Sequence, residues 1–280
     1  MKKAAYLLAV LAFAVSCGEN IEEKAGVHLE NARTAFKGGN FNLAKQEIDS
    51  IRILYPKAFE SRRQALELMQ KVEEAEQIRS IAYEDSIISS AAAAFESMKD
   101  NFVYEKDERY QDIGIFTVRS QAVTRNVSRN YLRGQVDEQG HMTLVSNWTG
   151  KSYVHHDRLR LESGGTFVET PACGDRHEFT DLGIAYERCS FTHGKDGGAA
   201  AFIAANRNSR IEVSQIAEKY SFRMVMMESD RQAIAQLYDL SQVLLTLYEH
   251  QNIRQEAERR LQFVRNRMQA GSEEQAVQQN

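Results

Sequence analysis

The chain has 280 residues, with 35 Lys and Arg against 39 Asp and Glu, a formal net charge of −4 and 42% hydrophobic residues. An acidic chain has no overall electrostatic attraction to nucleic acid, so we expect no nucleic-acid partner. The apolar content is ordinary for a globular protein, and the length allows one or two domains with hydrophobic cores.

The N-terminus has the pattern of a secretory signal. Lys2 and Lys3 precede an uncharged apolar run over residues 4–15, which is too short to cross a bilayer because crossing takes about 20 apolar residues. Ser16 supplies the small side chain that a signal peptidase needs. Residues 1–16 are therefore predicted to be a cleaved signal peptide. Without Lys2 and Lys3 the chain keeps 33 basic and 39 acidic residues, a net charge of −6.

A cysteine follows this junction directly. Ala14-Val15-Ser16-Cys17 resembles the lipobox of bacterial lipoproteins, although that family prefers Leu where this chain has Ala14. The resemblance implies fatty acylation of Cys17 on its sulfur and on the new N-terminus, and several acyl chains together make a stable membrane anchor. Gly18 differs from the Asp of an inner-membrane retention signal, so the expected location is the outer membrane of the cell envelope, on its periplasmic or surface face. The alternative is an ordinary cleaved signal with a coincidental cysteine.

Residues 17–98 are predicted to form a helical hairpin followed by a long helix. Apolar residues recur three and four positions apart, stop at Gly38-Gly39-Asn40 and resume until Pro56, which should end the second helix. The stretch resembles one tetratricopeptide repeat over roughly residues 25–58. The residues that carry the resemblance are Ala32, the Gly39-Asn40-Phe41 turn, Ala44 and Pro56.

The tetratricopeptide resemblance implies that the hairpin binds protein partners. We take exposed positions on its turn and concave side as candidate partner-binding residues. They are Asn31, Thr34, Lys37, Asn40 and Asn42. Such repeats cannot bury their faces alone, and the chain has no second copy, so the hairpin must pack on the next helix or on a partner. The next helix, over about residues 59–98, could break near Asp85 or Ser89-Ser90.

Residues 99–227 are predicted to form an antiparallel β domain. Alternating patterns over residues 131–136 and 141–148 flank a turn that contains Gly140, which is typical of a hairpin. Further strands are expected at residues 114–119, 153–161, 166–169, 184–191, 199–204 and 222–227. Cys173 and Cys189 lie in this region, and they could form a disulfide in an oxidising periplasm or remain two buried thiols.

Helical periodicity returns at Ser229, and residues 228–269 are predicted to form a long C-terminal helix that packs back as a coiled coil on the N-terminal helices. The polar residues 270–280 are predicted to be a disordered tail. The fold class is therefore α+β. The long helices also offer surfaces for self-association.

The strongest pattern for chemistry is His155-His156-Asp157. On a strand, His155 and Asp157 would share one face and His156 would point away. Two ligands are too few for a transition-metal site without partners elsewhere. In principle His141, His177 and His193 could supply more, but nothing in their spacing requires it. The chain has no nucleophile elbow, phosphate loop, dinucleotide fingerprint or redox Cys-x-x-Cys. We therefore expect no catalytic residues, metal or cofactor, and we interpret Trp148 as a core or sheet-edge residue.

Two functions fit these patterns. The first is a membrane-anchored, non-catalytic scaffold that binds other envelope proteins through its helices. The second is an envelope enzyme or carbohydrate-binding protein that uses the β domain around Trp148 and residues 155–157. Convergence of His155 and Asp157 with another ligand in a concave pocket would favour the second function.

Overall fold

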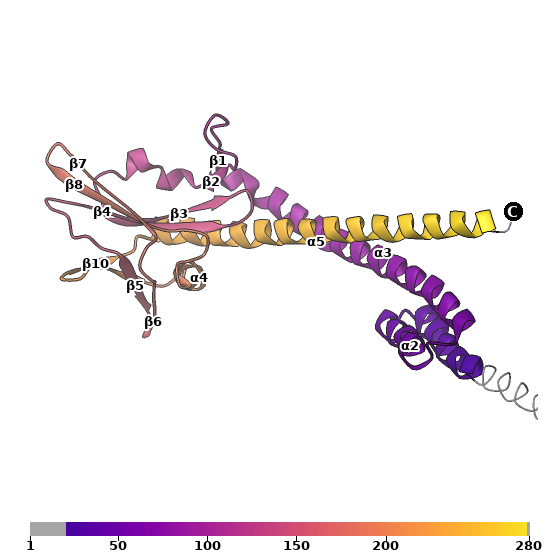
Figure 1. Ribbon diagram of the computed structural model, residues 1–280. Coiled ribbons are helices and arrows are strands. Elements are labelled where there is room, and N and C mark those ends of the chain that lie inside the picture. The colour runs from indigo at the N-terminus through magenta and orange to yellow at the C-terminus, as the bar shows by residue number, and fades with distance from the viewer. Residues whose placement is uncertain (1–20, 279–280) are drawn as a thin grey trace, which may run out of the picture. The chain divides into compact units, whose positions relative to one another are not determined.

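The computed structural model describes residues 21–278, and side chains to Glu273 (Figure 1). The predicted signal peptide and the lipobox with Cys17 lie outside the described residues. The chain is α+β, as predicted, with helices first, antiparallel sheets in the middle and a long C-terminal helix packed against the earlier helix. The first α-helix spans residues 21–37. The other α-helices are α2 Phe41–Leu54, α3 Phe59–Met98, α4 Ala199–Ala205 and α5 Glu228–Gln278. Short 3₁₀ turns are η1 Lys99–Asn101, η2 Arg119–Gln121 and η3 Val123–Arg125.

Within residues 21–278, ten strands form two sheets. The first six are β1 Val103–Glu105, β2 Ile115–Thr117, β3 Tyr131–Asp137, β4 Met142–Gly150, β5 Arg158–Ser163 and β6 Thr166–Glu169. The others are β7 Asp175–Asp181, β8 Ile184–Phe191, β9 Glu212–Ile216 and β10 Ser221–Val225. The larger sheet has the order β1-β2-β3-β4-β8-β7 and the smaller one β10-β9-β5-β6. All pairings are antiparallel. Two of them join strands that are distant in sequence, because β4 pairs with β8 and β5 pairs with β9. The chain therefore leaves the larger sheet after β4 to form β5 and β6, and returns to it with β7 and β8.

Contacts divide the chain into two compact units. The helical unit contains the described residues 21–85 and 252–278, and the β unit is Ser86–Gln251. The division therefore cuts through α3 and α5, whereas the sequence patterns had placed boundaries at the ends of these helices. Periodicity marks where an element begins and ends, but it does not show which parts of a long helix share a core.

A tight turn joins the first two helices of the helical unit. Gly39 takes a left-handed φ of 73°, its N–H donates to the carbonyl of Phe36, and the N–H of Asn40 donates to the carbonyl of Ala35. These two bonds form a Schellman motif, for which glycine is the preferred residue. The Asn40 side chain then caps α2 by accepting the N–H of Leu43 at 3.2 Å.

The hairpin packs on α3, which is the first of the two alternatives, the next helix or a partner, that the sequence had left open. Its apolar core combines hairpin residues such as Ala32 and Ile51 with Ala65, Leu68 and Val72 of α3. The C-terminal part of α5 also belongs to this unit, where its Ala257 and Val264 are buried.

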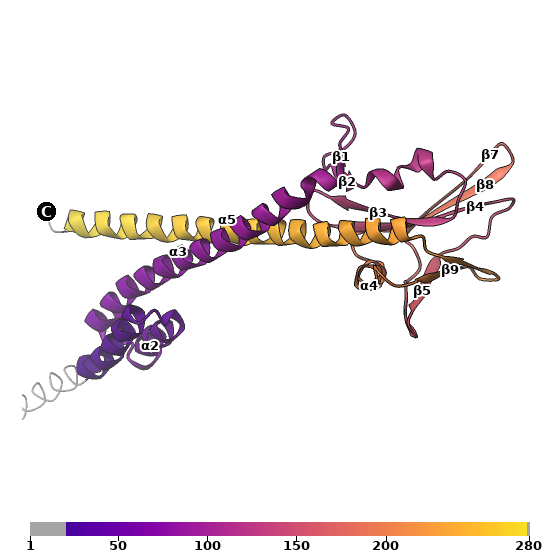
Figure 2. The same ribbon diagram turned by 180° about the vertical axis from the view of Figure 1, so that it is seen from behind.

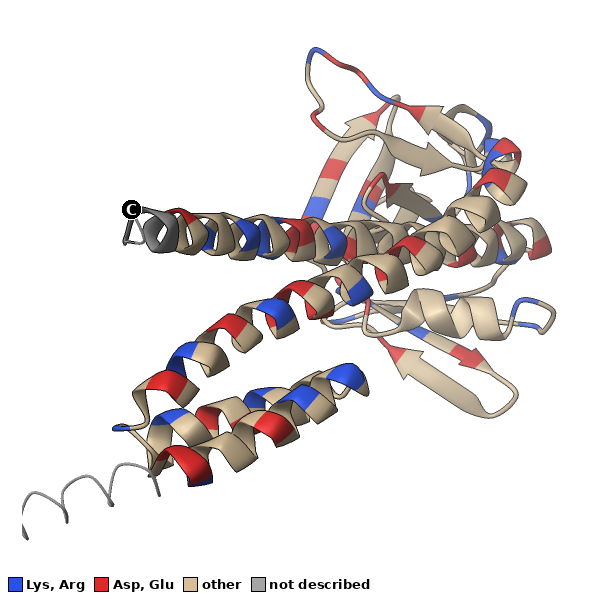
Figure 3. Cartoon of the chain, turned by 90° about the vertical axis from the view of Figure 1, so that its right-hand side faces the viewer, with Lys and Arg blue, Asp and Glu red and all other residues tan. Residues whose placement is uncertain are grey.

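Ion pairs join α3 and α5 within the helical unit. Arg265 of α5 contacts Glu74 at 2.8 Å, and Arg254 contacts Asp85 at 2.5 Å. Figure 3 shows charges of both signs interspersed along the two helices. None of the helices within residues 21–278 is long and apolar enough to cross a membrane.

In the β unit, α5 runs along the six-stranded sheet beside β3 (Figures 1 and 2). Gly134 makes room for this approach, because a Cβ there would lie 2.9 Å from the Leu237 side chain. The core lies between this face of the larger sheet, α4, α5 and the smaller sheet. It includes Leu144, Phe191 and Leu161.

The predicted hairpin over residues 131–148 is confirmed, with Tyr131 opposite Asn147 and Val136 opposite Met142. The strands predicted at 166–169 and 184–191 are also confirmed. The strand predicted at 199–204 is wrong, because this segment forms α4. Its alanines favour helix, and the Asp196 carboxylate caps the first turn by accepting the N–H groups of Gly198 and Ala200 at 3.0 and 2.7 Å.

Two further expectations differ from the structure. Helix α3 is unbroken, since Asp85 and Ser89-Ser90 are tolerated on exposed or half-exposed faces. Helix α5 continues to Gln278, where a disordered tail had been predicted from residue 270. The tail contains Gln, Glu and Ala, which are good helix formers, and a single Gly271 costs only about 1 kcal/mol relative to Ala.

Of the two alternatives for the cysteines, the structure has the disulfide. Cys173 follows β6 of the smaller sheet, Cys189 lies in β8 of the larger sheet, and their Cα atoms are 5.8 Å apart. The bond therefore ties the connection that leaves the smaller sheet to a central strand of the larger one.

Candidate functional site

The helical unit contains an apolar groove between α2 and α3. Its volume is about 450 Å³. The residues that line it are Ile48, Asp49, Ile51 and Arg52 of α2, and Phe59, Arg62, Arg63, Ala65, Leu66 and Met69 of α3.

The floor of the groove belongs to the core, whereas its walls are exposed. Ile51 and Ala65 are buried, but Phe59 is 74% and Leu66 is 55% exposed. Phe59, Leu66 and Met69 are seven and three positions apart, so they lie on one face of α3. Exposing large apolar side chains together is unfavourable, and such a patch marks an interaction surface.

The rim of the groove is mainly basic. Three arginines line it against one carboxylate, Asp49, which pairs with Arg52 at 3.1 Å. Arg63 pairs with Glu60 and Glu67 just outside the groove, and its hydrogen bond is the main reason that the pKa of Glu60 falls to about 2. Arg62 donates to the carbonyl of Pro56 at 2.8 Å.

The five candidate partner-binding residues are all exposed or half-exposed, as expected. They are Asn31, Thr34, Lys37, Asn40 and Asn42. None of them lines the groove, and the Asn40 side chain is engaged as the cap of α2. Leu66 and Met69 belong to the apolar stripe of the helix that was predicted over about residues 59–98. Periodicity finds this apolar face of α3, but it does not show which part of the face stays uncovered. The signal that could have found the groove is Phe59, a large apolar residue directly after the turn at Pro56.

In the β unit, the three residues of the His155-His156-Asp157 pattern do not converge. Residues 153–157 form no strand, so the predicted sharing of a face by His155 and Asp157 is wrong. The exposed His155 has a φ of 58° and contacts Glu178 at 2.9 Å, whereas His156 is fully buried. Asp157 contacts its neighbour Arg158 at 3.4 Å.

His156 belongs to a buried chain of hydrogen bonds. Its Nε2 is 3.0 Å from Ser146 Oγ, and its Nδ1 is 2.8 Å from a carboxylate oxygen of Glu187. Gln215 Nε2 donates to the same serine hydroxyl at 2.8 Å. Every hydrogen bond of this network has one donor and one acceptor if Gln215 donates to Ser146, Ser146 donates to His156, and His156 donates through Nδ1 to Glu187.

Ser146, His156 and Glu187 are thus connected as a nucleophile, a base and an orienting carboxylate are in a catalytic triad. The sequence patterns did not predict this network, because its members lie on β4, on a loop and on β8. However, Ser146 and His156 are 0% exposed, so neither can meet a substrate in this conformation. Glu187 also accepts the N–H groups of Val154, His155 and His156. The network thus satisfies buried polar groups and fixes the 153–157 loop against the larger sheet.

The charge state of Glu187 follows from these contacts. Burial raises the pKa of its carboxyl, but the hydrogen bonds from the His156 ring and from the N–H groups of residues 154 and 155 outweigh burial, so the pKa is lowered overall. Glu187 is therefore an ionised carboxylate held in a nest of backbone N–H groups.

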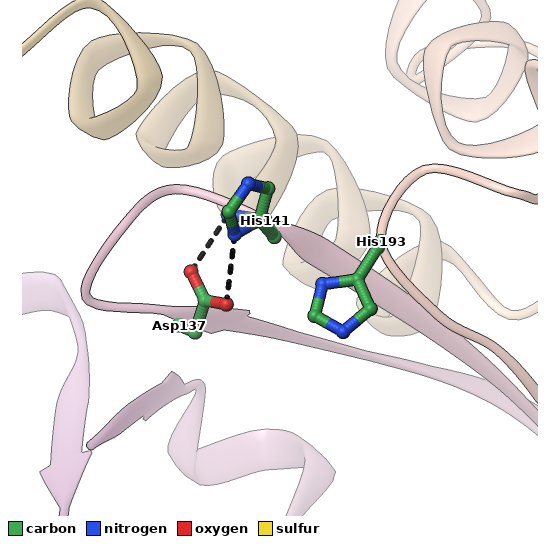
Figure 4. Close-up of side chains that lie close together, drawn as sticks. All are labelled: Asp137, His141 and His193. Atoms are coloured by element: carbon green, nitrogen blue, oxygen red, sulfur yellow. Dashed lines mark hydrogen bonds and ion pairs between the residues drawn. The ribbon is translucent and has the colours of Figure 1, made fainter. Parts of the chain in front are cut away.

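A second cluster contains Asp137, His141 and His193 (Figure 4). One ligand atom from each residue lies within 4.8 Å of the other two, so they are residues that could hold a metal ion together. Hydrogen bonding already accounts for two of them. Asp137 accepts the backbone N–H of His141 at 2.8 Å and contacts its ring Nδ1 at 3.1 Å, which closes the β3–β4 turn.

Trp148 packs edge to face on Phe222, with ring centroids 4.8 Å apart. Its ring therefore serves a contact between a strand of the larger sheet and one of the smaller sheet. The chain matches no protein-family model, and comparisons with curated proteins and with solved structures gave no match either.

Proposed function

We propose that this protein is a lipid-anchored envelope protein without catalytic activity, and that it binds a helical segment of a partner protein in the α2–α3 groove. The anchor is Cys17, and its support is the lipobox pattern of residues 14–17. The partner-binding role is supported by one observation above all, the exposure of Phe59 and Leu66 as walls of an apolar groove.

The chemistry of the groove favours an amphipathic helix as occupant. Apolar side chains spaced three, four and seven apart on a partner helix would cover Phe59, Leu66 and Met69, as in other helix-in-groove complexes. Arg52 and Arg63 already pair with carboxylates, but Arg62 on the rim has none among the described residues, so its guanidinium group favours a carboxylate on the flank of that helix. A membrane anchor would hold the groove close to other envelope proteins and raise their effective concentration.

The β unit gives less support to an enzyme. Among the described residues, Ser146, His156 and Glu187 have the connectivity of a catalytic triad. The serine hydroxyl of this network is fully buried between Gln215 and His156. The side chains of His155, His156 and Asp157 contact three different residues, so His155 and Asp157 do not converge. His155 does lie near Glu178 and Glu187, but Glu187 is already engaged by His156 and by backbone N–H groups.

Capture of partners from a membrane extract of the native host tests the proposal. Phe59→Ser and Leu66→Ser change exposed side chains, so each should leave stability within about 0.5 kcal/mol of the parent. Together they should reduce partner recovery by about tenfold or more, because two apolar anchors of the interface are lost. The partner is read by mass spectrometry of the recovered material.

Ile53→Ser is the matched control. Ile53 lies on α2 and is 64% exposed, but it does not line the groove. This variant should recover the partner as the parent protein does. Equal recovery by the parent, the control and the double variant would refute the groove as the binding site, and recovery of no partner by the parent would refute the proposed function.

A further inference from the structure

We propose that the face of the six-stranded sheet opposite the core binds a phosphate group carried by a small hydroxyl-bearing molecule, such as a sugar phosphate or a phosphorylated polyol. The site is separate from the groove of the helical unit and does not depend on it. Its centre is the pair Arg133 and Arg188.

Side-chain alternation places the site on the face opposite the core. Leu132, Leu144 and Cys189 point into the core of the β unit, so their strand neighbours point the other way. Strand register then sets the residues of this outer face in two adjacent rows. One row is Arg133, Val145, Ser190 and Asp175, and the next is Tyr131, Asn147, Arg188 and His177.

This face is hollow and partly polar. The hollow has a volume of about 450 Å³, which is larger than a single inorganic anion needs. The residues that line it are Arg133, Gln135, Thr143, Val145, Asp175, His177, Arg188, Ser190 and Thr192. A separate, smaller pocket lies at the end of the face near Tyr131 and Tyr186, where residues from the 123–129 segment also line it.

Among the residues whose side chains are described, Arg133 and Arg188 form no ion pair, although the charge of Glu105 acts on Arg133 from farther away. Within the part of the chain whose side chains are described, neither guanidinium has a carboxylate partner within 4.0 Å. Arg133 donates only to the amide oxygen of Gln135, at 3.1 Å. By contrast, Arg129 and Arg207 of the same unit each make a two-bond pair with an aspartate.

Partial burial of the charged Arg133 and Arg188 side chains also costs free energy. Both arginines are half-buried, and burial is the main reason that the pKa of Arg133 is lowered, with the nearby charge of Arg188 acting in the same direction. An arginine stays charged in proteins, so the cost is carried by the fold until an anion neutralises it. Two planar guanidinium groups that face one hollow match the oxygens of a phosphate, which can accept several N–H groups at once.

The other lining groups indicate what the phosphate is attached to. The hydroxyls of Thr143, Ser190 and Thr192 can donate or accept, whereas the carboxylate of Asp175 can only accept. Asp175 lies on the edge strand β7, at the end of the row that begins with Arg133. A ligand with a phosphate group on Arg133 and Arg188 and hydroxyl groups toward Asp175 would form hydrogen bonds with the arginines and with the carboxylate. Inorganic phosphate can contact only the arginines in this way, and an unphosphorylated sugar lacks the negative charge that the arginines need.

Calorimetric titration of the mature chain tests this inference with glucose 6-phosphate, inorganic phosphate, glucose and vesicles of phosphatidylglycerol. We expect glucose 6-phosphate to bind more tightly than inorganic phosphate, glucose not to bind at millimolar concentration, and affinity to fall as salt is raised. Binding only to the vesicles, lost in the same arginine variants, would assign the phosphate to a lipid headgroup and overturn the small-molecule ligand. Binding to none of the phosphate probes overturns the site.

Arg133→Met and Arg188→Met should each weaken glucose 6-phosphate binding by about tenfold or more. Arg223→Met is the matched control, because Arg223 is an exposed arginine of the smaller sheet whose carboxylate partners are Glu162 and Glu212. Unchanged affinity in both site variants overturns the proposal.

A measurement on the unmodified chain covers the case in which a variant does not fold. Phenylglyoxal modifies accessible arginines, and glucose 6-phosphate should slow the modification of Arg133 and Arg188 but not of Arg223, as read by peptide mass spectrometry. Equal rates at all three arginines with and without the sugar phosphate would overturn the inference.

Discussion

The ring Nδ1 of His156 lies 2.8 Å from the carboxylate of Glu187, and both side chains are completely shielded from solvent. A buried charge is tolerated only when it is paired and fully hydrogen-bonded. Glu187 meets this condition with the imidazole and three backbone N–H groups of the 153–157 loop. The pair therefore fixes an irregular loop that contains a left-handed histidine, His155.

Glu187→Ala should destabilise the protein strongly. The substitution leaves His156 and three loop N–H groups without their acceptor, and breaking a buried pair typically costs about 3–5 kcal/mol. Urea unfolding followed by circular dichroism measures the change. Glu178→Ala is the control, since its contact with His155 is partly exposed and is worth about 1 kcal/mol or less. Similar losses in both variants would contradict the structural role given to Glu187.

The lowered pKa of Glu187 should make the stability of the protein depend on pH. The pKa of Glu187 is lower in the folded chain than its ordinary value, so the folded state favours the ionised form. Its stabilising contribution is therefore fully present at pH values above the ordinary glutamate pKa of 4.5. The contribution is lost as the pH falls below about 4.5 toward the lower pKa of the folded state. Glu187→Gln should show a shallower loss of unfolding free energy over this acid window. A parallel pH profile for the parent and the variant would contradict the shift.

Reduction of the disulfide should lower stability. The bond between Cys173 and Cys189 closes a loop of sequence separation 16, for which the chain-entropy model gives about 3 kcal/mol. The double variant Cys173→Ala with Cys189→Ala should show the same loss in urea unfolding without reductant. The prediction fails if both thiols of the denatured, unreduced protein react with a maleimide, because the bond is then absent.

Two glycines separate the effect of backbone strain from that of packing. Gly140 has a φ of 90°, and a Cβ there would overlap the backbone of Leu244 and Leu245 in α5. Gly164 has a φ of 57°, but a Cβ there would meet no other atom within 4 Å. Gly164→Ala should cost about 1–2 kcal/mol from the left-handed backbone alone. Gly140→Ala should cost about 1–3 kcal/mol more, because a close-packed backbone cannot yield to the added methyl group. Equal losses in urea unfolding would contradict the close packing of α5 on the β3–β4 turn.

The anchor is tested by metabolic labelling with an alkyne-bearing fatty acid. The parent chain should incorporate the label, and Cys17→Ala should not, because the lipobox resemblance makes Cys17 the acylated residue. Cys173→Ala is the control and should keep the label. Labelling that survives Cys17→Ala would refute the anchor.

The sequence predicted the elements whose patterns are local. The Gly39-Asn40-Phe41 turn, the β3–β4 hairpin and both long helices follow from turn chemistry and from periodicity, which neighbouring residues determine. The segment at 199–204 was misassigned because its helix depends on a cap, Asp196, that lies three residues before it. Strand β7 was missed because it lies at the edge of the sheet and is largely exposed, so it lacks an apolar alternation.

The candidate sites were harder to predict because each depends on residues that are distant in the sequence. The groove needs α2 and α3 to pack while Phe59 and Leu66 stay uncovered, and periodicity alone cannot distinguish a covered apolar face from an open one. The chain from Ser146 through His156 to Glu187 joins two strands and a loop, and no sequence spacing brings these positions together.

Photo-crosslinking in the native host tests whether a partner protein binds in the groove. Benzoylphenylalanine placed at Leu66 in the native host reports what contacts the groove wall, and the same probe at Ile53 is the control on the outside of α2. We expect a crosslink to an envelope protein at position 66 through an amphipathic helix with carboxylates on its flanks, and no such product at position 53. No crosslink at position 66, identical products at both positions, or a crosslink to a second copy of this chain would contradict this expectation.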